Sequence, residues 1–389
     1  MKYIVKIITL FCLMATFFSS CREEEGIIPS TSRPVTYPDP NLGSVKGFFL
    51  LNEGNMGSNK ATLDYFDYET GVYTKNIYAE RNPGVVKELG DVGNDLQIYG
   101  DKLYAVINCS NLIEVMDVNT AKHIGSVSVP NCRYIVFKDK YAYVSSYAGP
   151  VEFDPNYRLG YVAKIDTATL QVVGECTVGY QPEQMAIAGN KLYVANSGGY
   201  RFPNYDTRVS VIDLDKFETI KQIDTEIINL HCMELDRYGN IWVSSRGDYY
   251  TVKSKTFTID SQTDMVTDVF DLISNGGMAR CRDSLYVYSS EWSYVSQDYT
   301  FTYAVIDTQK KKVVSRNLIT DGTDKKIIMP YGIAVNPDNG DFFVTDAKDF
   351  ITPGILYCFN EDGIKKWEVT TGDIPAHIVF TYKKLQPIK

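Results

Sequence analysis

The sequence predicts an all-β protein, specifically a seven-bladed β-propeller with four antiparallel strands in each blade. The main observation is a module of strand, polar loop, strand and final aspartate, and its clearest copy is Lys191–Asn196 followed by Arg208–Asp213. Seven copies follow one another at intervals of 47 to 53 residues. A four-stranded unit repeated at about this period is typical of propeller blades, and about seven of them are enough to close a ring.

The last residue of each module is an Asp in six copies and an Asn in the seventh. Short polar turns follow it, and a side-chain oxygen at this position can accept a hydrogen bond from the backbone two residues further on. We therefore predict that these residues shape the turn between the third and fourth strands of a blade and take no part in catalysis. They are Asp67, Asp117, Asp166, Asp213, Asp260, Asp307 and Asn360.

The four strands of one blade can be followed in the second repeat. Short alternating runs are separated there by turn residues such as Gly100-Asp101, which tolerate the positive φ of a tight hairpin. The predicted strands are Leu96–Tyr99, Leu103–Asn108, Ile113–Asp117 and His123–Val129.

The two ends of the repeat region predict how the ring closes. The first recognisable strand, Gly47–Asn52, has the pattern of a second strand, and the last, His377–Tyr382, has the pattern of a first strand. We expect the C-terminal strand to complete the first blade, because this pairing removes open sheet edges.

The N-terminus predicts export. A basic start and an apolar run to Phe18 are typical of a signal peptide and too short for a membrane span. Phe18-Ser19-Ser20-Cys21 resembles a bacterial lipoprotein signal, with Phe where Leu is usual, and Glu23–Glu25 resembles a surface-export signal of Bacteroidetes lipoproteins. We predict a signal peptide over residues 1–20, a lipidated Cys21 with a Pro-rich tether over 21–44, and the propeller over 45–389.

Charge argues against nucleic acid as a partner. Removal of residues 1–20, which hold Lys2 and Lys6 and no acid, takes the formal net charge from −9 to −11. The rest of the chain has no basic block. We therefore expect contact with the membrane to come from the lipid on Cys21.

Six cysteines remain after Cys12 and Cys21 are set aside, and their spacing matches no zinc motif. Cys109 and Cys132 are expected on the same face in neighbouring blades. A disulfide between them and two unbonded thiols in apolar surroundings are both open alternatives.

Function is predicted on the face that carries the long loops. The turns between first and second and between third and fourth strands are short, whereas the loops of the opposite face are long and rich in Tyr, Trp, Asn, Gln and Arg. Such side chains suit a large, flat ligand that carries amides. The predicted ligand-binding residues are Asn94, Arg133, Tyr134, Tyr147, Gln181, Glu183, Asn196, Tyr200, Arg201, His231, Arg246, Trp292, Tyr294, Tyr331 and Asp346.

The pattern from Lys191 to Asp213 resembles that of YncE-like and NHL-type propellers, and the resemblance covers about residues 45–385. With the lipoprotein signal, the acidic cluster and the Pro-rich tether, the chain resembles the cobalamin-binding surface propellers of gut Bacteroidetes, the BtuG-like lipoproteins. This resemblance implies an outer-membrane, surface-exposed lipoprotein that captures cobalamin (vitamin B12) or related corrinoids. It also implies delivery to a TonB-dependent transporter, with cobalamin as a bound ligand and no catalytic cofactor.

Two alternatives stay open. One is a calcium-dependent enzyme of the lactonase or lyase type. Propeller lactonases hold calcium with acid and Asn ligands on inner strands, and Glu53, Asn196 and Asp346 are the residues that such a set would use here. A scaffold that binds glycan or protein would use the same aromatic loops. We expect no enzyme activity, because no nucleophile motif is present and the three His residues are spread along the chain.

Overall fold

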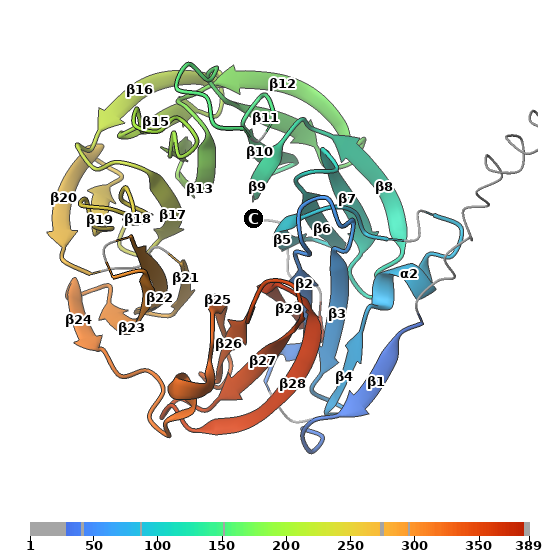
Figure 1. Cartoon of the computed structure of the whole chain (residues 1–389). Coiled ribbons are helices and arrows are strands. Elements are labelled where there is room, and N and C mark those ends of the chain that lie inside the picture. Colours follow the sequence, from blue (N-terminus) through green and yellow to red (C-terminus); the bar gives the residue numbers. More distant parts are fainter. Residues whose placement is uncertain are drawn as a thin grey trace, which may run out of the picture.

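The structure, a computed structural model, confirms the seven-bladed propeller. It describes residues 29–39, 43–85, 88–150, 152–272, 276–294 and 296–384, so the predicted signal peptide and the lipidation of Cys21 lie outside the described residues. Seven antiparallel sheets surround a central axis, and the chain runs around the ring from blade to blade (Figure 1).

Each blade has four strands from the axis outward, and the first blade has a fifth. Blade 1 contains β29 (Pro375–Tyr382), β2 (Val45–Asn52), β3 (Thr62–Asp67), β4 (Val72–Lys75) and β1 (Thr31–Pro34). Blade 2 contains β5 (Gly93–Tyr99), β6 (Lys102–Ile107), β7 (Leu112–Asp117) and β8 (His123–Ser128). Blade 3 contains β9 (Cys132–Lys138), β10 (Tyr141–Ser146), β11 (Tyr161–Asp166) and β12 (Gln171–Thr177). Blade 4 contains β13 (Pro182–Ala188), β14 (Lys191–Asn196), β15 (Arg208–Asp213) and β16 (Glu218–Asp224).

The last three blades follow the same order. Blade 5 contains β17 (Leu230–Leu235), β18 (Asn240–Ser245), β19 (Thr256–Asp260) and β20 (Met265–Phe270). Blade 6 contains β21 (Gly277–Cys281), β22 (Ser284–Ser293), β23 (Asp298–Asp307) and β24 (Lys312–Ser315). Blade 7 contains β25 (Pro330–Val335), β26 (Phe342–Asp346), β27 (Pro353–Phe359) and β28 (Lys365–Asp373). Among the described residues, the short helices are α2 (Ile77–Arg81) and the 3₁₀ turn η1 (Thr323–Lys326).

The ring closes as predicted, because β29 pairs antiparallel with β2 and forms the inner strand of blade 1. Phe48 on β2 is fully buried and contacts Phe66 of its own blade and Phe343 of blade 7, with ring centroids 5.1 and 4.9 Å apart. The seam between the first and last blades is therefore packed as a hydrophobic core.

Strand β1 extends blade 1 into the stretch that we predicted as tether. Thr31 to Pro34 pair with β4, and Val35 packs against the buried core of that blade. The ordered first blade thus includes residues upstream of position 45.

The aspartates that end the third strands form Asx turns, as predicted. Asp117 accepts a hydrogen bond from the backbone N–H of Asn119, and Asp213 from that of Asp215, at 3.1 and 3.0 Å. In the seventh copy the amide oxygen of Asn360 accepts the N–H of Ile364 at 2.9 Å.

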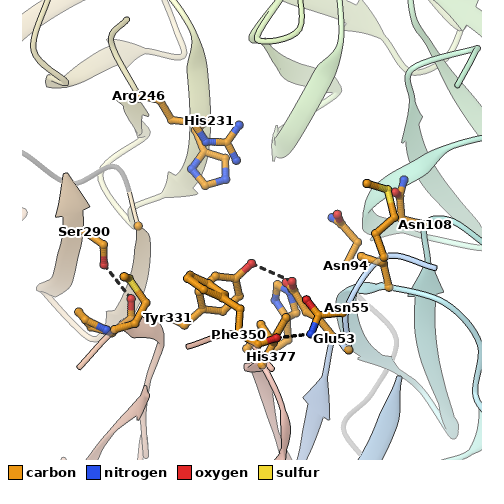
Figure 2. Close-up of a pocket in the computed structure, with 18 of the residues that line it drawn as sticks. Glu53, Asn55, Asn94, Asn108, His231, Arg246, Ser290, Tyr331, Phe350 and His377 are labelled. Carbon is orange, nitrogen blue, oxygen red and sulfur yellow. Dashed lines mark hydrogen bonds and ion pairs between the residues drawn. The ribbon is translucent and has the colours of Figure 1, made fainter. Parts of the chain in front are cut away.

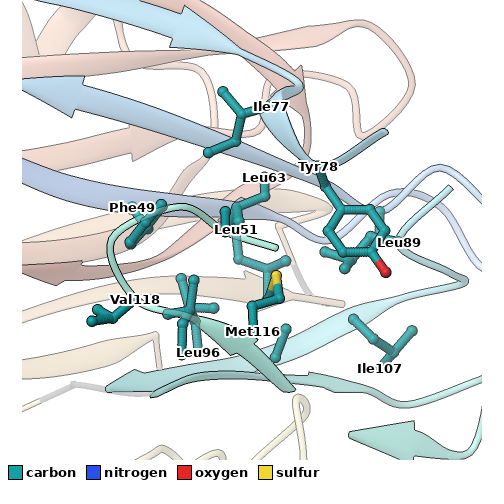
Figure 3. Packing of buried hydrophobic residues seen from close by; sticks show 14 residues of the cluster. Phe49, Leu51, Leu63, Ile77, Tyr78, Leu89, Leu96, Ile107, Met116 and Val118 are labelled. Carbon is teal, nitrogen blue, oxygen red and sulfur yellow. The ribbon is translucent and has the colours of Figure 1, made fainter. Parts of the chain in front are cut away.

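The core consists of layers between neighbouring blades. Figure 3 shows the layer between blades 1 and 2, where Leu51 and Leu63 of the first blade face Leu96 and Met116 of the second. Strands such as β2 and β14 bury nearly every residue, so both faces of a sheet pack against neighbouring blades. Among the described residues, no helix has the length and apolar character needed to cross a bilayer.

Candidate functional site

Two adjoining cavities lie on the long-loop face. The central cavity, of about 530 Å³, lies over the propeller axis and is lined by residues from every blade, including Glu53, His231 and Tyr331. The side cavity, of about 500 Å³, lies over blades 3 to 6. Both volumes are within the usual range for small-molecule sites. The residues that line both cavities are Arg133, Tyr200, Arg246 and Tyr249.

Irregular starts of the inner strands provide much of the wall. The pairing register shifts between Pro182 and Met185 of β13, and comparable shifts occur at the starts of β5, β9, β17, β25 and β29. A β-bulge adds a residue on one strand and re-aims its side chains, so an inner strand can present polar groups at the axis while its remainder stays regular. Residues within these irregular segments that line a cavity are Asn94, Arg133, Tyr134, Glu183, His231, Tyr331 and Ala376.

A buried carboxylate ties two arginines together at the wall between the cavities. Glu183 is fully buried and accepts hydrogen bonds from Arg246 Nη1 at 3.0 Å, from Arg133 Nη2 at 3.4 Å and from the Tyr147 hydroxyl. Burial opposes ionisation of Glu183, but the guanidinium groups of Arg133 and Arg246 outweigh it and lower the pKa of that carboxyl to about 2. The cluster is therefore ionised and fixed in place.

A second polar group lies on the opposite side of the central cavity. Tyr331 donates to Glu53 Oε2 at 2.8 Å, and His377 Nε2 is 3.2 Å from Glu53 Oε1 (Figure 2). Burial disfavours protonation of His377, but the carboxylates of Glu53 and Asp95 outweigh it and raise the pKa of this imidazole. The bond between the Asn55 amide and Phe350 carbonyl holds the adjacent loops of blades 1 and 7 together.

The loop Arg246–Tyr250 is shaped by its own sequence. Gly247 has a φ of 64°, and a side chain there would lie 2.1 Å from the Val252 carbonyl oxygen, so glycine is required. Asp248 accepts backbone N–H groups of Tyr250 and Thr251 at 2.9 and 2.8 Å. These constraints place Arg246 and its aromatic neighbours over the cavities.

Six aromatic side chains form a continuous arc along the rim over blades 4 to 6. Phe202 contacts Tyr250, which stacks on Tyr294 with ring centroids 4.4 Å apart and planes 11° apart. Phe202, Tyr250 and Tyr294 are each about half exposed. Exposed aromatic groups in contact with one another and next to a cavity indicate a binding surface. The members of this aromatic arc are Tyr205, Phe202, Tyr250, Tyr294, Trp292 and Tyr299.

The family is given by sequence comparison. A profile described as "Domain of unknown function (DUF5074)" matches residues 46–381, which is nearly the whole propeller. The chain belongs to the DUF5074 family. A search of curated protein sequences gives no match.

Solved structures share the fold of this DUF5074 protein. The hydrazine synthase of Kuenenia stuttgartiensis aligns with a TM-score of 0.56 and 17% identity over 69% of this chain and 77% of that chain. A quinonprotein alcohol dehydrogenase-like protein from Bacteroides thetaiotaomicron aligns with a TM-score of 0.56 and 16% identity over 86% of this chain and 78% of that chain. At these identities the likeness shows the propeller fold alone.

Most of the residues predicted from the sequence of this DUF5074 protein come together at the two cavities. They converge from six blades, because the long loops and strand starts all point to one face. Those that line the central cavity are Asn94, Arg133, Tyr134, Tyr200, His231, Arg246, Trp292 and Tyr331, and those that line only the side cavity are Tyr147, Glu183 and Tyr294.

Four predicted residues do not line either cavity and instead support loops. Gln181 is fully buried and accepts the N–H of Tyr200 at 2.7 Å, which fixes the loop of blade 4. Arg201 stacks on Tyr180 with its guanidinium 3.5 Å from the ring centroid. The predicted ligand contacts of Gln181, Arg201, Asn196 and Asp346 thus find no support in their positions.

The calcium set proposed as an alternative does not assemble. Asn196 donates to the Arg208 carbonyl at 2.7 Å and accepts the Gly179 N–H, while Asp346 accepts the N–H groups of Met329 and Ile328. Hydrogen bonds to backbone groups therefore already engage the side chains of Asn196 and Asp346. Of the three residues, only Glu53 lines either of the two cavities. Within the described part of the chain, no group of three His, Cys, Asp or Glu side chains has the arrangement of a metal site.

Several residues at the site were not among the predicted ligand-binding residues. Glu53 and His377 form the pair opposite the arginines, and Tyr249 and Tyr288 add aromatic walls. Trp292 and Tyr299 pair across an extended hairpin of β22 and β23, so Trp292, which we predicted on the long loops, lies on a strand. The alternation of Tyr286, Tyr288, Ser290 and Trp292 was the available signal for this longer strand.

Cys109 and Cys132 are both free thiols in the structure. The Cys132 thiol is buried and donates to the Leu112 carbonyl at 3.4 Å, and that of Cys109 donates to the Asn108 side chain at 3.4 Å. Of the two alternatives left open by the sequence, a disulfide or two free thiols, the structure contains the two free thiols.

Proposed function

We propose that the protein is a surface lipoprotein that captures cobalamin or related corrinoids on its long-loop face and delivers them to a TonB-dependent outer-membrane transporter. The observation that supports this most is the exposed aromatic arc beside two adjoining cavities with a partly buried arginine pair in their common wall. A corrin is a large, flat macrocycle fringed by amides, and this combination of surfaces is complementary to it.

The aromatic arc supplies broad apolar contact for such a ligand. Stacked rings such as Tyr250 and Tyr294 already restrain each other, so little rotamer entropy is lost when a ligand covers them. The guanidinium groups of Arg133 and Arg246 offer N–H donors to amide carbonyl oxygens. Apolar contact and hydrogen bonding are thus available to one ligand at the same time.

The site is also held in shape before any ligand arrives. Hydrogen bonds anchor the loops that line it, including those from the Tyr200 N–H to Gln181 and from the Asn55 amide to the Phe350 carbonyl. A preorganised site costs little ordering free energy on binding, which favours high affinity at low ligand concentration. That property suits a protein that captures a scarce nutrient.

Calorimetry with the mature chain and cyanocobalamin tests the proposal. We expect saturable heat at a stoichiometry of one and an increase in melting temperature with micromolar ligand. Absence of both would reject corrinoid capture. Titration with oligosaccharides in parallel distinguishes the glycan-binding alternative, which predicts binding of glycan and none of cyanocobalamin.

A further inference from the structure

The wall between the two cavities carries more hydrogen-bond donors than its protein partners use. Arg133 and Arg246 each donate to Glu183, and a guanidinium has five N–H groups. Arg133 Nε is buried and has no hydrogen-bond partner among the described residues. Both side chains border both cavities and are mostly but not fully covered, with 14% and 24% of their surface exposed.

The other ionisable groups at the site are already engaged. Glu53, across the central cavity, is bound by Tyr331 and His377. Asp248, at the side cavity, accepts backbone N–H groups of its own loop. His231 lines the central cavity and its Nε2 is 3.3 Å from the Tyr134 hydroxyl. The two guanidinium groups thus share one buried carboxylate and retain donors for a further anion.

The geometry keeps these donors in place. Glu183 holds both guanidinium groups, and that of Arg133 lies 4.8 Å from the centroid of the Tyr147 ring. Hydrogen bonds from arginine to phosphate oxygens are strong because the donor and acceptor are both charged and the planar fork matches the oxygens. An anion could therefore bind without reordering the side chains.

We infer that Arg133 and Arg246 together bind a phosphate group of the ligand. This inference rests on the proposed function, because in cobalamin the group concerned is the phosphodiester of the nucleotide loop. The protein should then prefer corrinoids that carry this phosphate over cobinamide, which lacks it.

Two ligands that differ by the phosphate alone give the direct test: cobinamide and cobinamide phosphate, measured by calorimetry in the presence of excess cyanide. Wild-type protein should bind cobinamide phosphate at least about tenfold more tightly, the scale of one hydrogen bond to a charged group. Arg246→Gln should abolish this preference. Glu183→Gln raises the charge of the cluster and should increase it.

The two variants are expected to change the preference for cobinamide phosphate in opposite directions. General damage to the site would instead weaken the binding of both ligands to the same extent, so the two explanations can be told apart. If Arg246→Gln does not fold, the double variant Glu183→Gln/Arg246→Gln replaces it, since no buried carboxylate then remains; its preference should fall below that of Glu183→Gln, because the cluster charge drops from +2 to +1. Equal affinity of wild-type protein for the two ligands would overturn the inference.

A thermal-shift titration with inorganic phosphate separates this inference from the proposed function. If neither corrinoid binds but phosphate stabilises wild-type protein more than Arg246→Gln, corrinoid capture is rejected and an anion site at the arginine pair stands. If neither corrinoid binds and phosphate has no arginine-dependent effect, both ideas are rejected.

Discussion

Tyr250 of blade 5 and Tyr294 of blade 6 stack with their ring centroids 4.4 Å apart and their planes 11° apart, although both are about half exposed. The pair joins Phe202 on one side to Trp292 on the other. Loops from three blades thus form one aromatic surface. A stacked pair at the middle of this arc is the position where loss of one ring should matter most.

Replacement of Tyr294 by Ala should weaken cyanocobalamin binding by roughly threefold to thirtyfold, the effect of losing an aromatic contact and some buried apolar area. Calorimetry measures the affinity, and the melting temperature should change little because the side chain is exposed. Tyr238→Ala is the matched control, since Tyr238 is also exposed in blade 5 but lies in the short β17–β18 turn of the opposite face. Equal losses in both variants would contradict a role for the arc.

The fold followed from the sequence because its determinants are local. The alternation of apolar residues, the tight turns and the repeated aspartate act within one blade, and their period fixes the blade count. Strand β1 was not predicted. Its four residues, Thr31–Pro34, carry no alternating pattern, and they form a strand only because β4 offers an open edge for pairing.

Only part of the candidate site could be predicted from the sequence. The lengths of the loops predicted which face of the propeller carries the site. Bulges such as that between Pro182 and Met185 could not be predicted, because no residue pattern in the sequence indicates them. The fate of each polar side chain also depends on neighbours far away in sequence. Asn196 and Glu183 are both fully buried, yet Asn196 bonds to the backbone while Glu183 bonds to arginines 50 and 63 residues away.

Acid should destabilise the fold through Glu183. The pKa of this carboxyl is lowered from 4.5 to about 2, so its contribution to the free energy of unfolding is present above pH 4.5 and is lost as the pH falls toward 2. A shift of this size corresponds to roughly 3 kcal/mol. Denaturant unfolding from pH 2 to 7 should show this loss in wild-type protein and a smaller one in Glu183→Gln. Glu175→Gln, an exposed carboxylate on β12, should retain the wild-type profile.

Closure of the ring predicts a large effect of removing β29. A chain that ends at Gly372 lacks this strand, leaves β2 with an unpaired edge and exposes Phe48 at the seam. Burial of Phe48 alone contributes about 3–5 kcal/mol by comparison with other Phe→Ala substitutions. We expect aggregation or loss of the cooperative thermal transition. A chain that ends at Lys384 keeps β29 and should melt like the full chain; a normal transition in the shorter chain would contradict closure by β29.

The proposed lipidation of Cys21 predicts that Cys21→Ala releases the protein from membranes. A thioether-linked lipid is the membrane contact expected for an acidic chain, so without it the protein should appear in the soluble fraction and fail to incorporate labelled fatty acid. Cys109→Ala, a thiol within the propeller, is the control and should remain membrane-bound. Persistence of Cys21→Ala in the membrane fraction would show another anchor.

His377 predicts a pH effect of opposite sign to that of Glu183. Burial disfavours the charged imidazole, but Glu53 and Asp95 raise its pKa above 6.5, so protonated His377 stabilises the fold fully below pH 6.5 and this contribution is lost as the pH rises through the raised pKa. His377→Gln should therefore flatten the decline in unfolding free energy above pH 6.5, at a cost of about 1.5–3 kcal/mol below it. Gln can still bond to Glu53, so His377→Ala should cost more. An unchanged slope in His377→Gln would show that the proton on this imidazole does not stabilise the fold.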